Sequence, residues 1–223
     1  MRKSVLVAAT ATALLVGGSA PAYAQRAEVS AFAGWTLADG VSGDTVEGGD
    51  GNRYNRIDPK DSASWGLSVG VFASENAEVG FLFGQQKTTL QAGGTNTRDV
   101  DNLTINSYHP YFAYNFGEGD SRVRPYILVG IGATSYSDLN YTSAGGQQRT
   151  ISGETRLSTT WGGGVKAYAS DNVGVRLGLQ WTPTYIKSDA AGWWCDPFWG
   201  CYVVGNSQYA DQFQLSGGLT VRF

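Results

Sequence analysis

Five charged residues stand at alternate positions in largely apolar or small-residue surroundings, and they are the first candidates for chemistry: Glu28, Glu78, Lys166, Arg176 and Arg222. Such positions predict side chains that point into the fold, where an unpaired ion costs several kcal/mol. We expect Glu28 to pair with Arg222, because Glu28 begins the first predicted strand and Arg222 ends the last. These two strands are neighbours if the sheet closes on itself. The other three are expected to form a second cluster. The charges could act as a gate or an anion-preferring constriction, but a structural polar plug is the favoured interpretation.

The single histidine is the next candidate, because serine and histidine together can support nucleophilic catalysis. His109 would share a strand face with Ser107. Two residues on one strand do not make a catalytic triad, and the sequence places no carboxylate to orient the imidazole. We therefore expect a histidine whose hydrogen bonds are satisfied inside the fold, no enzyme activity, and no bound cofactor or metal ion.

The only two cysteines, Cys195 and Cys201, enclose five residues that include Pro197 and Gly200. The stretch lacks the further cysteines or histidines of a zinc site, so in an oxidising compartment it predicts a small loop closed by a disulfide. The same stretch is rich in aromatic side chains, which would not be left in water without a contact surface. They could extend a membrane-interface girdle, cap the mouth of the fold or bind an external hydrophobic ligand. These aromatic residues are Trp193, Trp194, Phe198, Trp199 and Tyr202.

Alternation of apolar and polar residues indicates that strands must position these side chains. In the last segment Phe213 and Leu215 fall on one face, and Gln214 falls on the other. Seven further segments alternate in a similar way. In the segment 103–116 the apolar positions change parity, which predicts a β-bulge near Ser107. The eight strands are expected within residues 29–37, 65–73, 78–86, 103–116, 125–133, 157–167, 173–181 and 209–223.

The connections between these segments alternate in length. Tight turns are expected at residues 73–76, 117–121 and 170–172. Short periplasmic turns and long external loops are typical of outer-membrane barrels, so the long connections are expected to face the exterior. These loops are expected at residues 38–61, 91–99, 138–153 and 187–207.

A soluble β-sandwich or lipocalin-like barrel would also alternate, so the polar face decides between the two. In a soluble protein that face should be rich in Lys, Glu and Asp, whereas here it is mostly Gly, Ser, Thr and Gln. The sequence therefore predicts an all-β, transmembrane, antiparallel up-and-down β-barrel, and its many inward glycines are expected to leave wet cavities. Aromatic residues near the predicted strand ends suit interfacial girdles. They include Trp35, Trp65, Trp161, Trp181 and Tyr209.

The first 24 residues predict export. Arg2 and Lys3 precede an uncharged, mostly apolar stretch at residues 5–16, and Ala22-Tyr23-Ala24 offers a cleavage site for signal peptidase. A membrane anchor is the alternative, but a spanning helix needs about 20 apolar residues. Residues 1–24 are therefore expected to be a signal peptide, and residues 25–223 the barrel domain. Without the signal peptide, 14 of the 16 basic residues remain against 19 acidic ones, and the resulting net charge of −5 argues against nucleic acid as a partner.

Three stretches of the chain resemble the OmpA-like and OmpW-like small outer-membrane barrels, which are often called porin-family proteins. They are residues 124–132 (RPYILVGIG), 161–168 (WGGGVKAY) and 219–223 (LTVRF). The resemblance implies a barrel in the outer membrane of a Gram-negative bacterium. It also implies that Phe223 occupies the terminal aromatic position that the barrel-assembly machinery recognises. One departure is His109-Pro110-Tyr111, where OmpW-like proteins carry His-Leu-Pro-Pro.

Two functions remain open on these grounds. The first is a structural role or a narrow passage for small solutes, hydrophobic ones included. The second is a surface-binding module, adhesin-like or receptor-like, in which the barrel displays its first and fourth external loops. Outer-membrane lipid and lipopolysaccharide are expected partners in either case.

Overall fold

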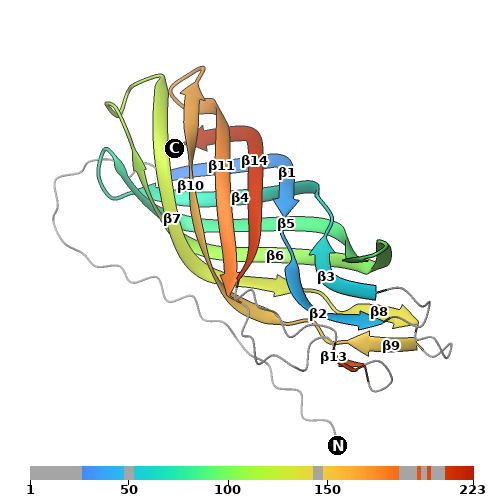
Figure 1. Ribbon diagram of the computed structural model, residues 1–223. Helices are drawn as coiled ribbons and strands as arrows, with labels where there is room; N and C mark the ends of the chain where they lie inside the picture. The colour runs from blue at the N-terminus through green and yellow to red at the C-terminus, as the bar shows by residue number, and fades with distance from the viewer. Residues whose placement is uncertain (1–26, 48–52, 143–147, 186–194, 197–199, 202–208) are drawn as a thin grey trace, which may run out of the picture.

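Eight antiparallel strands close into a barrel in the computed structural model, as the sequence predicts (Figure 1). The structure describes residues 27–47, 53–142, 148–185, 195–196, 200–201 and 209–223, so the expected signal peptide lies outside the described residues. Each barrel strand pairs with the next, and the last pairs with the first. Within the described ranges, no helix is long and apolar enough to cross a membrane. The barrel strands are β1 (Ala27–Ala38), β4 (Ser62–Phe72), β5 (Ala77–Gly94), β6 (Arg98–Asn115), β7 (Val123–Tyr136), β10 (Thr155–Tyr168), β11 (Val173–Tyr185) and β14 (Tyr209–Arg222).

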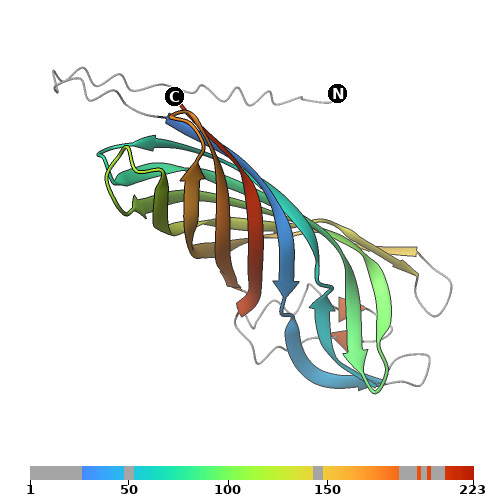
Figure 2. The same ribbon diagram turned by 90° about the horizontal axis from the view of Figure 1, so that it is seen from above.

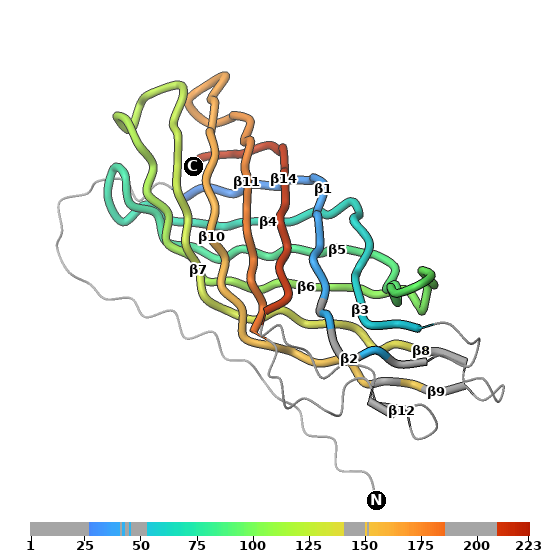
Figure 3. The backbone as a smooth tube through the Cα atoms, in the orientation of Figure 1, coloured from blue at the N-terminus to red at the C-terminus, as the bar shows by residue number. Residues whose placement is uncertain are grey.

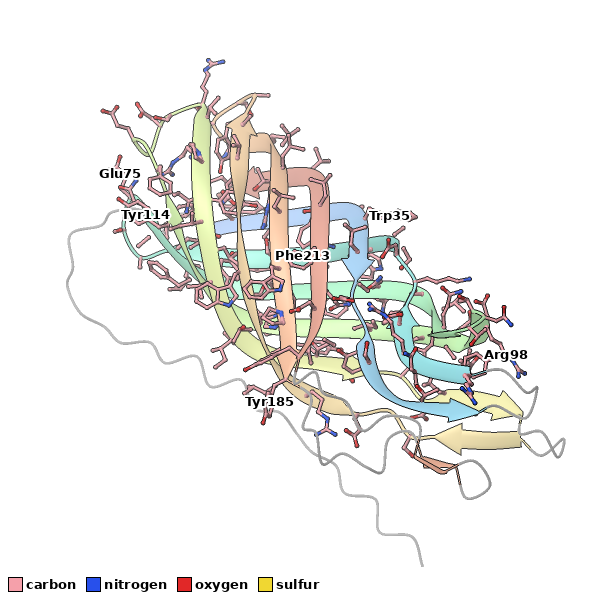
Figure 4. All side chains as sticks on the ribbon, in the orientation of Figure 1. Trp35, Glu75, Arg98, Tyr114, Tyr185 and Phe213 are labelled. Atoms are coloured by element: carbon pink, nitrogen blue, oxygen red, sulfur yellow. The ribbon has the colours of Figure 1, made fainter. Side chains whose placement is uncertain are left out.

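The two ends of the barrel differ. Short turns join β4 to β5, β6 to β7 and β10 to β11 at one end, where β1 begins and β14 finishes side by side (Figure 3). Figure 4 places Glu75 and Tyr114 at this end and Arg98 at the opposite one. Because outer-membrane barrels keep their short turns in the periplasm, this is the periplasmic end.

At the external end the strands continue where the sequence analysis expects loops. Strands β2 (Val41–Glu47) and β3 (Arg53–Pro59) form a hairpin, and β8 (Leu139–Thr142) pairs with β9 (Gln148–Ile151). Together with residues 88–94 of β5, 98–105 of β6 and Tyr136 at the end of β7, these four strands form what we call the collar, which reaches beyond the ends of β11 and β14 (Figure 2). The expectation of loops at 38–61, 91–99 and 138–153 was wrong in this respect. Hairpin hydrogen bonding continues beyond the apolar belt, where no acyl chains impose an alternating apolar pattern.

The outward face of the barrel is apolar along the spanning part of every strand. Leu177 and Leu179 are 63% and 65% exposed, and Figure 4 shows Trp35 on the outer side of β1. Burying so many large apolar side chains in lipid rather than water is strongly favourable. Aromatic rings contact one another across this face, as Trp181 and Phe213 do with centroids 6.0 Å apart.

Strand β6 contains no bulge at Ser107, so that expectation was wrong. The pairing of β6 with β5 runs in continuous register from Tyr114 to Asp101, and its only shift lies further out. Leu103 and Ile105 therefore point inward, where they are 3% and 2% exposed. The apolar positions of this strand switch from its outward to its inward face here, because the collar has an apolar interior of its own. This cluster comprises Leu90, Leu103, Ile105, Tyr136 and Leu139.

Glycines in the periplasmic half of the barrel make room for large inward side chains instead of leaving the wet cavities expected there. A Cβ atom on Gly66 would collide with the ring of Phe32, and one on Gly178 would lie 2.6 Å from the Tyr126 hydroxyl. Phe32, Leu82, Tyr111, Ala113, Tyr126 and Leu128 form one buried cluster. The narrow lumen is thus packed with side chains at this level.

Gly80 provides a direct test of this packing. A Cβ atom there would meet the carbonyl oxygen of Val69 and lie 2.7 Å from Cζ of Tyr111. We expect Gly80→Ala to lower the free energy of unfolding by about 1–3 kcal/mol, because the core has no room for the methyl group. Urea unfolding in detergent micelles measures this loss. Gly217→Ala is the matched control, since its Cβ would face lipid at 3.3 Å from a flexible Leu177 methyl group; equal losses for both variants would contradict the packing argument.

Candidate functional site

Lys166 lies at the centre of a buried ion cluster in the periplasmic half of the lumen. Its Nζ atom is 2.5 Å from Oε1 of Glu28 and 2.8 Å from Oε2 of Glu78. The three side chains come from β10, β1 and β5, and none is more than 3% exposed. The ammonium group therefore joins opposite walls of the barrel.

Hydroxyl and amide groups satisfy the remaining capacity of both carboxylates. The Tyr111 hydroxyl donates to Glu78 at 2.5 Å, and the Asn115 amide donates to the other oxygen of Glu78 at 3.1 Å. Tyr168 donates to Glu28 at 2.5 Å. A buried ion pair is stabilising only when its remaining hydrogen-bonding groups are also satisfied, and this one meets that condition.

Arg222 lies opposite Glu28 across the seam between β1 and β14, the neighbourhood expected from the sequence. Its Nε atom is 3.9 Å from Oε2 of Glu28, a longer contact than the one Glu28 makes with Lys166. The guanidinium carbon lies 3.9 Å from the ring centroid of Tyr168, and Nη1 donates to the Gly119 carbonyl at 3.1 Å. Arg222 therefore closes the periplasmic mouth by stacking and by bonding to a turn more than by ion pairing.

Arg176 does not join the carboxylates as a third member of the expected cluster. Its Nε atom donates to the Tyr126 hydroxyl at 2.8 Å, and Nη1 donates to Ser68 at 3.1 Å. The guanidinium also lies over the rings of Phe32 and Tyr126, at 5.2 and 4.9 Å. Stacking and neutral hydrogen bonds thus stabilise this charge.

Arg124 on β7 is 1% exposed, a buried charge that was not predicted from the sequence. The alternation along this strand does indicate it, because Pro125 is at an outward position and its neighbour Arg124 must therefore point into the lumen. Arg124 and Arg176 flank Lys166 in register on the two adjacent strands, so one wall of the lumen is basic. Three cations surround the ring of Phe72 at 5.7 to 5.8 Å. We call the following group the plug: Glu28, Phe72, Glu78, Tyr111, Arg124, Tyr126, Lys166, Tyr168, Arg176 and Arg222.

His109 is fully buried and pairs with Ser158 on β10 rather than with Ser107. The distance between Nε2 and the Ser158 Oγ atom is 2.9 Å, and Thr134 donates to the same serine oxygen at 2.9 Å. Nδ1 has no hydrogen-bond partner among the described residues, so the expectation that all hydrogen bonds of this histidine are satisfied was wrong, and no carboxylate orients the ring there. This pair lacks the geometry of a catalytic triad.

Above the plug the lumen is polar and uncharged. A small cavity of about 30 Å³ is lined by glutamines and hydroxyl residues of six strands, with Phe32 at its base. Gln212 donates to Gln86 at 2.8 Å, and Gln214 donates to Ser64 at 2.6 Å. This space suits a few water molecules.

The remaining candidates lie at the edges of the described structure. Strand β12 (Cys195–Asp196) pairs with β13 (Gly200–Cys201), and the backbone places Cys195 directly opposite Cys201. The aromatic residues Trp193, Trp194, Phe198, Trp199 and Tyr202 lie outside the described residues. Phe223 is 70% exposed, and its amide donates to the Ala27 carbonyl at 2.8 Å. Among the described residues, no group of three or more His, Cys, Asp or Glu residues could hold a metal ion.

A closed barrel with an apolar outer belt, short turns at one end and a plugged lumen defines a small outer-membrane β-barrel. Residues 10–223 match the family model for the outer membrane protein beta-barrel domain, and the chain belongs to that family. This membership places the protein in the outer membrane of Gram-negative bacteria.

Two solved structures share the fold at low sequence identity. The outer membrane protein OprG from Pseudomonas aeruginosa is 11% identical, with a TM-score of 0.60 over 89% of this chain and 96% of that one. The outer membrane protein AlkL, solved in lipid bilayers, is 15% identical, with a TM-score of 0.54 over 93% of this chain and 94% of that one. No curated protein matches the sequence significantly.

Proposed function

We propose that this protein is a non-enzymatic, structural barrel of the outer membrane whose lumen is sealed at its periplasmic half. The observation that carries the proposal is the bridge from Lys166 to both Glu28 and Glu78, which joins opposite walls of the lumen at 2.5 and 2.8 Å. A solute moving through the barrel would have to separate these buried ions, which costs several kcal/mol. The narrow-passage alternative therefore has little support in this arrangement.

Osmotic swelling of proteoliposomes tests the seal for neutral solutes. Vesicles that contain the purified protein are expected to swell in small sugars no faster than protein-free vesicles. Because an eight-stranded barrel has an interior only wide enough for its own side chains, the plug leaves no path for such solutes. Swelling at the rate produced by a general porin would overturn the sealed barrel.

A surface-binding role is the second candidate, and the collar favours it. The collar contains its own apolar cluster, and ion pairs stiffen its outer surface. Arg56 donates to Asp58 at 2.6 Å and also pairs with Asp39. A variant in which a two-residue turn replaces residues 41–57 should keep the barrel but lose attachment of whole cells to epithelial monolayers. Unchanged attachment would remove this candidate.

We also propose that Cys195 and Cys201 form a disulfide. Directly opposed residues of an antiparallel pair have Cα atoms about 4.5–5.5 Å apart, a separation that a disulfide can bridge. Such a short ring stabilises by about 2 kcal/mol, mostly within the loop, so reduction should barely change the unfolding of the barrel. Peptide mass mapping without reductant is expected to find the two cysteines linked. Two free thiols in protein taken from outer membranes would refute the bridge.

A further inference from the structure

The outer face of the barrel carries a hollow just beyond the apolar belt, over β4, β5 and β6. Its volume is about 500 Å³, and it forms where residues 60–61 join β3 to β4. Alternation along β5 and β6 points Lys87, Thr89, Asn102 and Thr104 outward into this hollow. These four side chains therefore line the hollow on the membrane side of the wall, and the buried Thr88 and Leu103 line it from the inner side.

The height of the hollow matches the outer boundary of the membrane. Lys87 lies ten residues along β5 from Ala77, where the strand begins at the periplasmic end. A strand that rises about 3.3 Å per residue at a tilt of about 45° climbs about 23 Å over that stretch. The lipid-facing band of such barrels is about 25 Å tall. The Lys87 ammonium therefore lies at the level of the outer-leaflet headgroups.

The wall below Lys87 changes from apolar to polar in an ordered way. The rings of Trp65, Phe83 and Tyr108 contact edge to face or tilted, with centroids 5.5 and 5.4 Å apart, and form an aromatic ledge. Directly above it, Gln85 donates to Asn106 at 2.8 Å and accepts from the Trp65 indole at 3.3 Å. Apolar ledge, amide row and cation follow one another toward the exterior. An acyl chain, a sugar amide and a phosphate of one glycolipid follow in the same order.

Four of the polar side chains that line the hollow are free to bind a ligand. The others are engaged: the Asp61 carboxylate accepts from the Ala38 amide at 3.1 Å, Ser62 accepts from Gln86 at 3.0 Å, and Thr88 donates to the Lys60 carbonyl. Among the described residues, Lys87 has no ion-pair partner, and the side chains of Thr89, Asn102 and Thr104 make no hydrogen bond. Lys60 also lines the hollow, but its ammonium is held by Asp99 at 2.9 Å. The hydrogen bond from Lys60 lowers the pKa of Asp99, so this carboxylate stays charged and neutralises Lys60.

The other described positions at the outer end of the apolar belt are less suited to binding a phosphate. Where the apolar belt finishes on β1 and β14, the described outer positions include Asp39 and Asp211, which would repel an anion. On β7 and β10 they include Ser135 and Thr155, which bond to each other at 3.2 Å. A hollow and an unpaired cation thus coincide in the sector of β4, β5 and β6.

We propose that this hollow binds a phosphorylated glycolipid of the outer leaflet, the lipid A part of lipopolysaccharide. Lys87 pairs with the phosphate, the hydroxyls of Thr89 and Thr104 donate to its oxygens, and the acyl chains pack on the aromatic ledge of Trp65, Phe83 and Tyr108. Charge-assisted hydrogen bonds are the strong ones at such sites. The inference does not rest on the sealed lumen, because the side chains that bind the glycolipid lie on the outer face of the barrel.

Native mass spectrometry of the delipidated protein tests the assignment, with diphosphoryl lipid A as the probe. The full-length barrel is expected to retain lipid A, and Lys87→Gln should weaken its retention at least about tenfold. Asp99→Asn should strengthen retention, because it releases Lys60 into the hollow. Arg122→Gln is the matched control, since it removes an exposed cation from a periplasmic turn and should change nothing. The heat-dependent gel shift of each variant verifies that the barrel has formed.

Two further arms identify the source of the phosphate. Dephosphorylated lipid A should bind as weakly to the native protein as diphosphoryl lipid A binds to Lys87→Gln, and inorganic phosphate at equal concentration should not displace lipid A. Equal retention by native protein and Lys87→Gln would overturn the site. Inorganic phosphate that binds as tightly as lipid A would overturn the glycolipid assignment.

Discussion

Replacing Lys166 with methionine is expected to lower the free energy of unfolding by about 3–5 kcal/mol. The substitution leaves two carboxylates, Glu28 and Glu78, buried at 2% exposure without their shared cation. Methionine is unbranched and only one heavy atom shorter than lysine, so the loss reports mainly the charge rather than a cavity. Urea titration in detergent micelles, followed by tryptophan emission and by the heat-dependent gel shift, measures it.

Neutralising the whole cluster should restore most of this stability. The triple variant Glu28→Gln, Glu78→Gln, Lys166→Met removes the cation together with both of its carboxylates, and Arg222 loses only a 3.9 Å contact with Glu28. Well-packed neutral replacements of buried ion pairs are often neutral or stabilising. We expect the triple variant to be more stable than Lys166→Met alone. If the three single losses simply add in the triple variant, the groups do not act as one cluster.

Removing the ring of Tyr111 is expected to have an effect of similar size. This side chain fills the space above Gly70 and Gly80, and its hydroxyl donates to Glu78 at 2.5 Å. Tyr111→Ala should therefore lower the free energy of unfolding by about 3–5 kcal/mol, as deletion of a buried aromatic ring does. It should also open space beside the Lys166 bridge. The same urea titration measures the change.

Tyr111→Phe separates the two contributions of this residue. The ring stays and only the hydrogen bond to Glu78 is lost, so the expected loss is about 1–3 kcal/mol. Equal losses for the alanine and phenylalanine variants would mean that the ring itself does not contribute to packing. Such a result would contradict the account of the glycines at 70 and 80 as space for Tyr111.

Alternation was sufficient to predict the barrel, its closure and the inward set of charges. Glu28 and Arg222 lie opposite each other because the first and last strands of a closed barrel must pair. Pairing along neighbouring strands follows from topology alone. The same alternation also implies that Arg124 points into the lumen, because its neighbour Pro125 points outward.

Contacts across the lumen could not be predicted in this way. Lys166 reaches Glu28 and Glu78 from a strand that is adjacent to neither of theirs. Which carboxylates it contacts depends on side-chain lengths and on the space left by glycines. The parity rule also failed at Leu103 and Ile105, because it equates apolar with lipid-facing. The collar lies beyond the apolar belt, so no acyl chains favour apolar residues on its outer face, and apolar residues turn inward as in a soluble protein.

Single-channel recording across a planar bilayer tests the sealed lumen most directly. The native protein, inserted from detergent, is expected to show no stable conductance steps in molar potassium chloride, because ions would have to displace the buried bridge of Lys166, Glu28 and Glu78. Tyr111→Ala should show openings under the same conditions, since it removes packing beside that bridge. A steady conductance of the native protein that Tyr111→Ala leaves unchanged would contradict the account.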